Sequence, residues 1–132
     1  MIPDLQASFL CEDVRIEASG GNSIVGIVNF IGAPQFPVRV MKLCVWTRWC
    51  SGSGVFTQKT RLVMPDDQTV IADSVTEFNL NHEEGHATNI NFFGGLEFPQ
   101  PGIYHIEIYL DDTLKLRYPL PIINPQTESH ER

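Results

Sequence analysis

The chain has 132 residues, an apolar fraction of 42% and a formal net charge of −7, a size typical of one domain that buries a core without metal or disulfide staples. Its acidity argues against a nucleic-acid partner, and no apolar run reaches the about eighteen residues of a membrane-spanning helix. The chain has three cysteines without regular spacing, and its first residues lack a basic region followed by a hydrophobic one. We therefore expect a cytoplasmic protein with free thiols.

Short alternating segments separated by glycine- and proline-rich turns follow one another along the chain. The expected strands are residues 7–17, 23–31, 38–49, 55–64, 69–80 and 88–98, followed by the two arms of a hairpin within residues 101–120. This spacing is typical of an all-β fold, and no segment has the period of an amphipathic helix. We therefore predict an immunoglobulin-like antiparallel β-sandwich of about eight strands over residues 1–123, with a flexible polar tail at 124–132.

Residues 18–65 contain five basic residues and no acidic one. If Trp49 faces the core, alternation along the strand places Trp46 outward, and cations from this strand and the next can lie beside it. The expected surface comprises Lys42, Trp46, Arg48, Lys59 and Arg61. Because tryptophan and arginine are enriched at interaction hot spots, we take this surface as the candidate site for an acidic protein partner or for self-association. In the alternative, Trp46 faces the core and the cations form an ordinary solvated face.

Residues 82–86 match the H-E-x-x-H motif of zinc hydrolases, in which a helix presents both histidines to the metal. The surrounding asparagines and Gly85 disfavour a helix, and the flanking segments resemble strands. We expect a solvated loop here, and no metal, cofactor or catalytic residue in the chain. The alternative function is a small metal-binding protein or metal-dependent hydrolase that uses His82, Glu83 and His86.

The closing hairpin has a predictable register, because paired residues must share a face of the sheet. Pairing across a two-residue turn would oppose Ile108 to Lys115, so we predict a three-residue loop at 111–113 that opposes Leu110 to Leu114. The other predicted pairs are Ile108 with Leu116, Ile106 with Tyr118, Glu107 with Arg117 and Tyr109 with Lys115, the last two on the solvent side. Tyr104, which follows Pro101 and Gly102, resembles the tyrosine corner of immunoglobulin-like sandwiches, whose hydroxyl bonds back to the backbone.

Three stretches carry a resemblance to a known group of proteins: LQASFLCED at 5–13, APQFP at 33–37 and FGGLEFPQPGIY at 93–104. With them the chain resembles a bacterial family of small, uncharacterised β-rich proteins, over residues 5–122. The resemblance implies a stand-alone β-rich domain and no site residues. We therefore expect a non-enzymatic protein–protein interaction or structural module that acts through a sheet face or a sheet edge.

Overall fold

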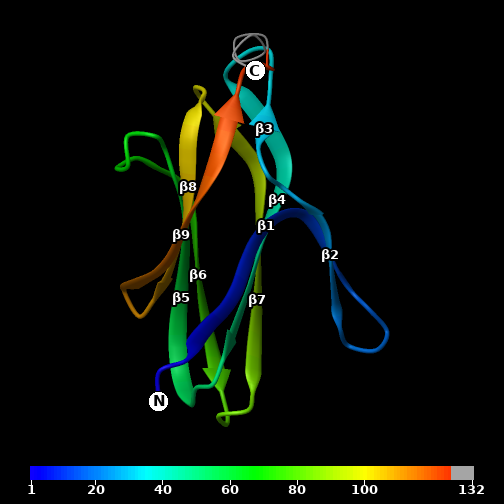
Figure 1. Ribbon diagram of the computed structural model, residues 1–132, viewed down its shortest axis with the longest axis vertical. Helices are drawn as coiled ribbons and strands as arrows, with labels where there is room; N and C mark the ends of the chain where they lie inside the picture. The colour runs from blue at the N-terminus through cyan, green and yellow to red at the C-terminus, as the bar shows by residue number, and fades with distance from the viewer. Residues whose placement is uncertain (126–132) are drawn as a thin grey trace.

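Nine strands in two sheets form the part of the chain that the computed structural model describes, residues 1–125. The strands are β1 (Asp4–Ile16), β2 (Asn22–Ile27), β3 (Ile31–Gly32), β4 (Val38–Cys50), β5 (Gly54–Val63), β6 (Val70–Leu80), β7 (His86–Phe98), β8 (Gly102–Leu110) and β9 (Thr113–Ile123). One sheet has the order β2-β1-β4-β7 and the other β3-β9-β8-β5-β6 (Figure 1). The predicted all-β fold is confirmed, and the predicted tail lies outside the described residues from residue 126 on.

The sequence predicts about eight strands and the described residues form nine, because the expected strand 23–31 divides into two. β2 pairs with β1 in the four-stranded sheet, whereas β3 pairs with the end of β9 in the five-stranded sheet. Residues 28–30 between them leave the ladder and cross from one sheet to the other. The pairing of β3 with β9 is parallel, so the predicted antiparallel order does not hold at this edge.

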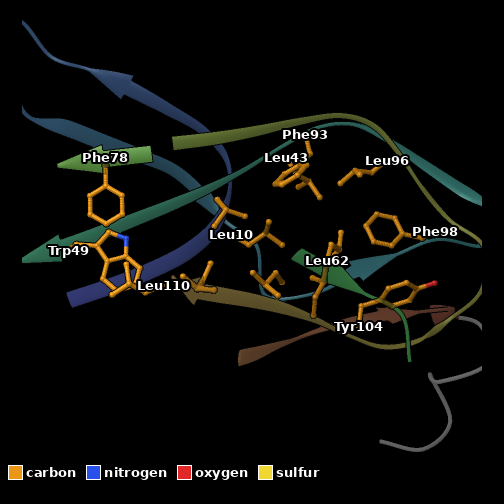
Figure 2. Close-up of a cluster of buried hydrophobic side chains, with 14 of the residues drawn as sticks. Leu10, Leu43, Trp49, Leu62, Phe78, Phe93, Leu96, Phe98, Tyr104 and Leu110 are labelled. Atoms are coloured by element: carbon orange, nitrogen blue, oxygen red, sulfur yellow. The ribbon is translucent and has the colours of Figure 1, made fainter. Parts of the chain in front are cut away.

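A core of alternating inward residues fills the space between the sheets. Trp49 and Phe78 stack at one end of this core, and Phe98 and Tyr104 pack edge to face at the other (Figure 2). Trp49 is fully buried, so of the two alternatives that the sequence left open, the one with Trp49 in the core holds. Burial of side chains of this size is worth roughly 1.5–3 kcal/mol each, which is why the period-two pattern determines the faces.

A buried polar network centred on Gln58 crosses the middle of the same core. The Oε1 atom of Gln58 accepts hydrogen bonds from Trp49 Nε1 and Asn89 Nδ2, each at 2.7 Å. Its Nε2 atom donates to Thr60 Oγ1 at 2.8 Å and to Asn91 Oδ1 at 3.3 Å. Since every polar group of the Gln58 side chain has a partner, the amide has one orientation, and it links β4, β5 and β7 across the sandwich.

The hairpin between β8 and β9 combines a tight turn with a bulge. Asp111 and Asp112 form a two-residue turn with positive φ angles of 45° and 70°, and Leu110 pairs with Thr113. The predicted three-residue loop is therefore wrong, together with the pairs of Leu110 with Leu114 and Tyr109 with Lys115. Lys115 is the extra residue of a register shift, beyond which the predicted pairs of Ile108, Glu107 and Ile106 are confirmed. A two-residue turn with positive φ at both positions matches the right-handed twist of the two strands. The bulge then returns the apolar residues of β9 to the core face.

Tyr104 forms the predicted corner. Its hydroxyl donates to the backbone carbonyl of Gln100 at 2.7 Å, and its ring packs against Phe98 with the centroids 5.2 Å apart. This side chain is fully buried. It therefore ties the turn before β8 to the core.

The outer edge of β9 is covered by β3 only at Ile122 and Ile123. Upstream, β9 contains Pro119 and Pro121, which have no backbone N–H to offer to a further strand. Proline is tolerated within a sheet where its nitrogen faces away from the ladder. This stretch of edge is therefore a poor template for a neighbouring strand.

Candidate interaction surface

The structure does not bring the five predicted surface residues to one face. Lys42, Trp46 and Arg48 lie on β4 in the four-stranded sheet, whereas Lys59 and Arg61 lie on β5 in the five-stranded sheet. The connection at residues 51–53 crosses from one sheet to the other, so the two strands do not pair although they are consecutive in the chain. The expected single cationic face is therefore corrected to two separate groups.

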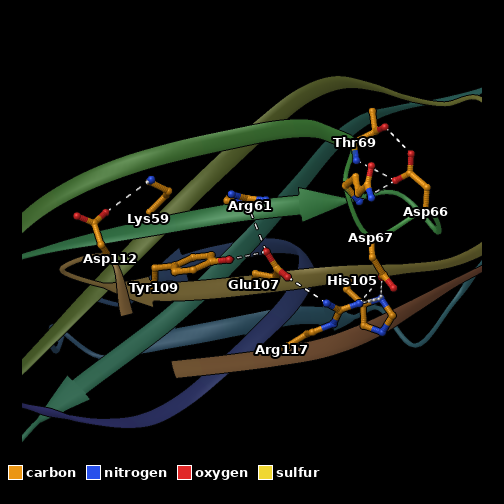
Figure 3. A network of polar contacts seen from close by, with 11 residues as sticks. Lys59, Arg61, Asp66, Asp67, Thr69, His105, Glu107, Tyr109, Asp112 and Arg117 are labelled. Atoms are coloured by element: carbon orange, nitrogen blue, oxygen red, sulfur yellow. Dashed lines mark hydrogen bonds and ion pairs between the residues drawn. The ribbon is translucent and has the colours of Figure 1, made fainter. Parts of the chain in front are cut away.

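The outer side of the five-stranded sheet is neutralised by its own ion pairs (Figure 3). Glu107 has a side chain only 7% exposed, and its carboxylate lies 3.2 Å from Arg117 Nη1 and 3.5 Å from Arg61 Nε. Tyr109 donates its hydroxyl to the same carboxylate at 3.0 Å. Glu107 is thus buried instead of solvated as predicted, and Lys59, 3.8 Å from Asp112, is also paired. Both predicted cations of this sheet, Lys59 and Arg61, therefore have a carboxylate of the same sheet or its hairpin as partner.

Trp46 faces outward from the four-stranded sheet, as predicted, but it is only 9% exposed. The Phe9 ring stacks on it with the centroids 6.2 Å apart, and its Nε1 atom donates to Asn22 Oδ1 at 3.2 Å. β1 leaves β4 after Cys11 and forms a hairpin with β2 beside the sheet (Figure 1), and Asn22, the first residue of β2, accepts the hydrogen bond of the indole. The expectation of an exposed tryptophan is wrong because this hairpin supplies a cover.

Phenylalanines on the neighbouring strands extend this apolar surface. Phe9 on β1 pairs with Trp46 and is 37% exposed, and Phe92 on β7 pairs with Cys44 and is 55% exposed. We call Phe9, Trp46, Phe92 and Arg48 the aromatic face. An antiparallel sheet with a solvated side normally carries polar residues there, so three aromatic side chains on one outer face are unusual.

The two cations beside the aromatic face differ in their partners. Lys42 Nζ donates to Asp13 Oδ1 at 2.9 Å and lies 5.1 Å from the Phe92 ring centroid. This hydrogen bond raises the pKa of Lys42 and lowers the pKa of Asp13. Arg48 has no ion-pair partner within residues 1–125, and its Nε atom is buried without a hydrogen-bond acceptor. Arg48 is thus the cation of this face that has no carboxylate partner among the described residues.

A family model spans both sheets, matching residues 6–123, from the third residue of β1 to the last of β9. The chain belongs to the family of unknown function DUF6941. The matched DUF6941 region includes the whole aromatic face, and the resemblance to an uncharacterised β-rich family agrees with it. No curated protein matches the sequence. In the described part of this DUF6941 protein, no helix has the length and apolar character needed to cross a membrane.

Two residues of the DUF6941 aromatic face, Phe9 and Phe92, were not predicted from the sequence. The sequence does contain a signal that could have identified Phe92: Phe92 and Phe93 are adjacent on one strand and must point to opposite sides of the sheet. With Phe93 buried in the core, Phe92 has to lie outside. The same argument applies to Phe9, because the next residue on β1, Leu10, is buried in the core. The pairing of Phe9 with Trp46 then places it on the aromatic face.

The H-E-x-x-H segment is the tight connection between β6 and β7, as predicted. The N–H of Gly85 donates to the carbonyl of His82 at 3.0 Å, which closes a turn, and His86 is already the first residue of β7. His82 Nδ1 lies 3.6 Å from Glu84 Oε2. Within residues 1–125 no group of three or more His, Cys, Asp or Glu residues is arranged to hold a metal ion.

Two buried acidic groups near β1 predict a loss of stability in alkali. Burial raises the pKa of Cys11 to about 11 and the pKa of Tyr118 to about 12. Because both values are raised, the neutral groups stabilise the fold fully below the unfolded values of 9.0 and 10.0, and this stabilisation is lost as the pH rises toward 12. Urea unfolding at increasing pH should show this decline. Tyr118→Phe should show a smaller decline, and an equal decline in both proteins would contradict the assignment to Tyr118.

Proposed function

We propose that this DUF6941 protein is a non-enzymatic protein–protein interaction module that binds its partner through the aromatic face. The observation that supports the proposal is the exposure of Phe9 and Phe92, 37% and 55%, around the stacked ring of Trp46 on the outside of a sheet. Exposed apolar clusters with a polar rim are typical of docking surfaces. Trp46 is already held by Phe9 and Asn22, so a partner would meet a surface that needs little ordering.

The chemistry of the partner follows from Arg48. Its guanidinium is the unpaired charge beside the rings, and it fits a carboxylate on the partner in a two-pronged hydrogen bond. The proposed partner is an acidic protein, or the acidic region of a second copy of this chain. We place the interaction in the bacterial cytoplasm, with no nucleic acid, cofactor or catalytic step.

The proposal extends to the fold. We propose that the two-sheet arrangement is of the immunoglobulin-like type, supported by the tyrosine corner of Tyr104 and the core position of Trp49 on a central strand. Such sandwiches commonly present binding surfaces on rigid sheets.

Phe92→Asp is expected to weaken binding through the aromatic face by about thirtyfold or more, because hot-spot truncations cost about 2 kcal/mol or more. The matched control is Val55→Asp, which places the same charge on β5 at a side chain 64% exposed. Sedimentation of the purified protein at low and high salt tests self-association, and titration with a partner recovered from the host tests hetero-association. A monomer at both salt concentrations, with any recovered partner bound equally by both variants, would contradict the proposal.

A further inference from the structure

One half of β4 has a strand neighbour on only one side. Residues 44–50 of β4 pair with β1 on one edge and with β7 on the other. Among the described residues, 1–125, residues 38–43 pair with β7 alone, because β1 leaves β4 after Cys11 and turns to pair with β2. The backbone N–H and C=O groups on this free edge repeat at the spacing of a strand, so an extended polypeptide is the shape that matches them.

A groove of about 600 Å³ lies beside this free edge. Val40 and Leu43 of β4 form one side, and residues 27–31, which run from β2 to β3, form the other. Ile27 and Phe30 are 51% and 54% exposed, so the wall opposite β4 is apolar. The volume falls within the range of ligand sites.

The charge of the groove is set by Glu12. Lys42 lines the groove too, but its ammonium group is bound by Asp13 at 2.9 Å. Glu12 is exposed and has no ion-pair partner among residues 1–125. Its carboxylate lies over Gly26, where an added Cβ would be 2.2 Å from Oε2. The glycine therefore leaves room for an unpaired negative charge at the groove.

We propose that this groove binds an extended peptide segment of another protein, which adds a strand to residues 38–43 of β4. The segment has apolar residues that pack against Ile27 and Phe30, and a lysine or arginine that pairs with Glu12. A second folded copy is a poorer occupant, because its edge strand arrives with a neighbouring strand and residues 27–31 already occupy that position. This site is separate from the aromatic face and does not depend on it.

The probe is a short synthetic peptide of alternating valine and threonine with one central lysine, blocked at both ends. Titration into isotopically labelled protein is expected to shift the amide signals of residues 38–43 and 27–31. A version with N-methyl groups on alternate residues should not bind, because it cannot form the strand hydrogen bonds. A version with glutamate in place of lysine should bind about twofold to fivefold more weakly, the range of an exposed ion pair.

Charge reversal at the groove distinguishes specific recognition of the peptide from nonspecific binding. Glu12→Lys should reverse the preference, so that the glutamate peptide binds more tightly than the lysine peptide. Glu77→Lys, an exposed change on β6, is the matched control and should leave the preference unaltered. Phe92→Asp should retain peptide binding, which separates this test from that of the aromatic face.

Any of four results would overturn the proposal. The first three are the absence of amide shifts with every peptide, binding of the N-methylated peptide as tight as that of the parent peptide, and a Glu12→Lys variant that still prefers the lysine peptide. The fourth is a dimer of the protein that dissociates on Phe30→Glu, since that would assign the groove to a second copy of the chain.

Discussion

Replacing Gln58 with leucine is expected to lower the free energy of unfolding by about 3–5 kcal/mol. The substitution places an apolar side chain of similar size in the core but removes the four hydrogen bonds made by the Gln58 amide. The donors Trp49 Nε1 and Asn89 Nδ2, each 2.7 Å from Gln58 Oε1, lose their acceptor inside the sandwich. A buried donor without a partner costs about 1–3 kcal/mol of stability, so two such donors account for most of the expected decrease. The lost hydrogen bonds to Thr60 and Asn91 add a smaller amount. Urea unfolding monitored by Trp49 fluorescence measures the change.

Gln58→Glu is the matched control for shape. It retains the acceptor oxygen but buries a carboxyl group, whose pKa should be higher in the folded than in the unfolded protein. A raised folded pKa means that the folded form takes up the proton more readily, so this variant should become more stable as the pH falls from neutrality, relative to the parent. A Gln58→Leu variant within about 1 kcal/mol of the parent would contradict the role of the network.

Replacing Tyr104 with alanine should destabilise the protein by about 3–5 kcal/mol, whereas replacing it with phenylalanine should cost about 1–2 kcal/mol. The larger effect comes from removing a fully buried ring that packs 5.2 Å from Phe98. The smaller effect isolates the hydroxyl, which donates to the Gln100 carbonyl at 2.7 Å. The two variants therefore divide the contribution of the corner into packing and hydrogen bonding.

Thermal and urea unfolding of both Tyr104 variants provide the measurement. Tyr109→Phe is the control, because it removes a hydroxyl from the outer face of the same strand, where the partner is Glu107. If Tyr104→Phe were as stable as the parent, the turn before β8 would be held by other contacts. If Tyr104→Phe and Tyr104→Ala were equally destabilised, the hydroxyl alone would account for the corner.

Local patterns predicted the all-β class and the inward faces well. Alternation placed the β8 residues Tyr104, Ile106 and Ile108 on one buried face, because a strand with one buried face repeats every second residue. It left open whether Trp46 or Trp49 faces the core. The same rule gave most of the hairpin register. It failed at the turn, where the bulge at Lys115 places Leu114 opposite Tyr109 on the outer face, while the pairs from Ile108 onward are as predicted.

The site was less predictable because it depends on which sheet each strand joins. Lys59 and Arg61 follow Trp46 closely in sequence, yet the chain crosses the sandwich between β4 and β5, and this crossing has no local signature. The cover that Asn22 gives to Trp46 likewise comes from a bend in β1. The network at Gln58 was missed because inward polar residues on strands resemble solvent-facing ones until their partners are known.

The two prolines of β9 have a consequence for assembly. The molecule has a receptive stretch of backbone at residues 38–43 of β4, while Pro119 and Pro121 blunt the outer edge of β9. Strand-by-strand growth of fibres needs a donor edge and an acceptor edge on every subunit. Because Pro119 and Pro121 make β9 a poor donor edge, growth through a contact between β9 of one molecule and β4 of the next is disfavoured.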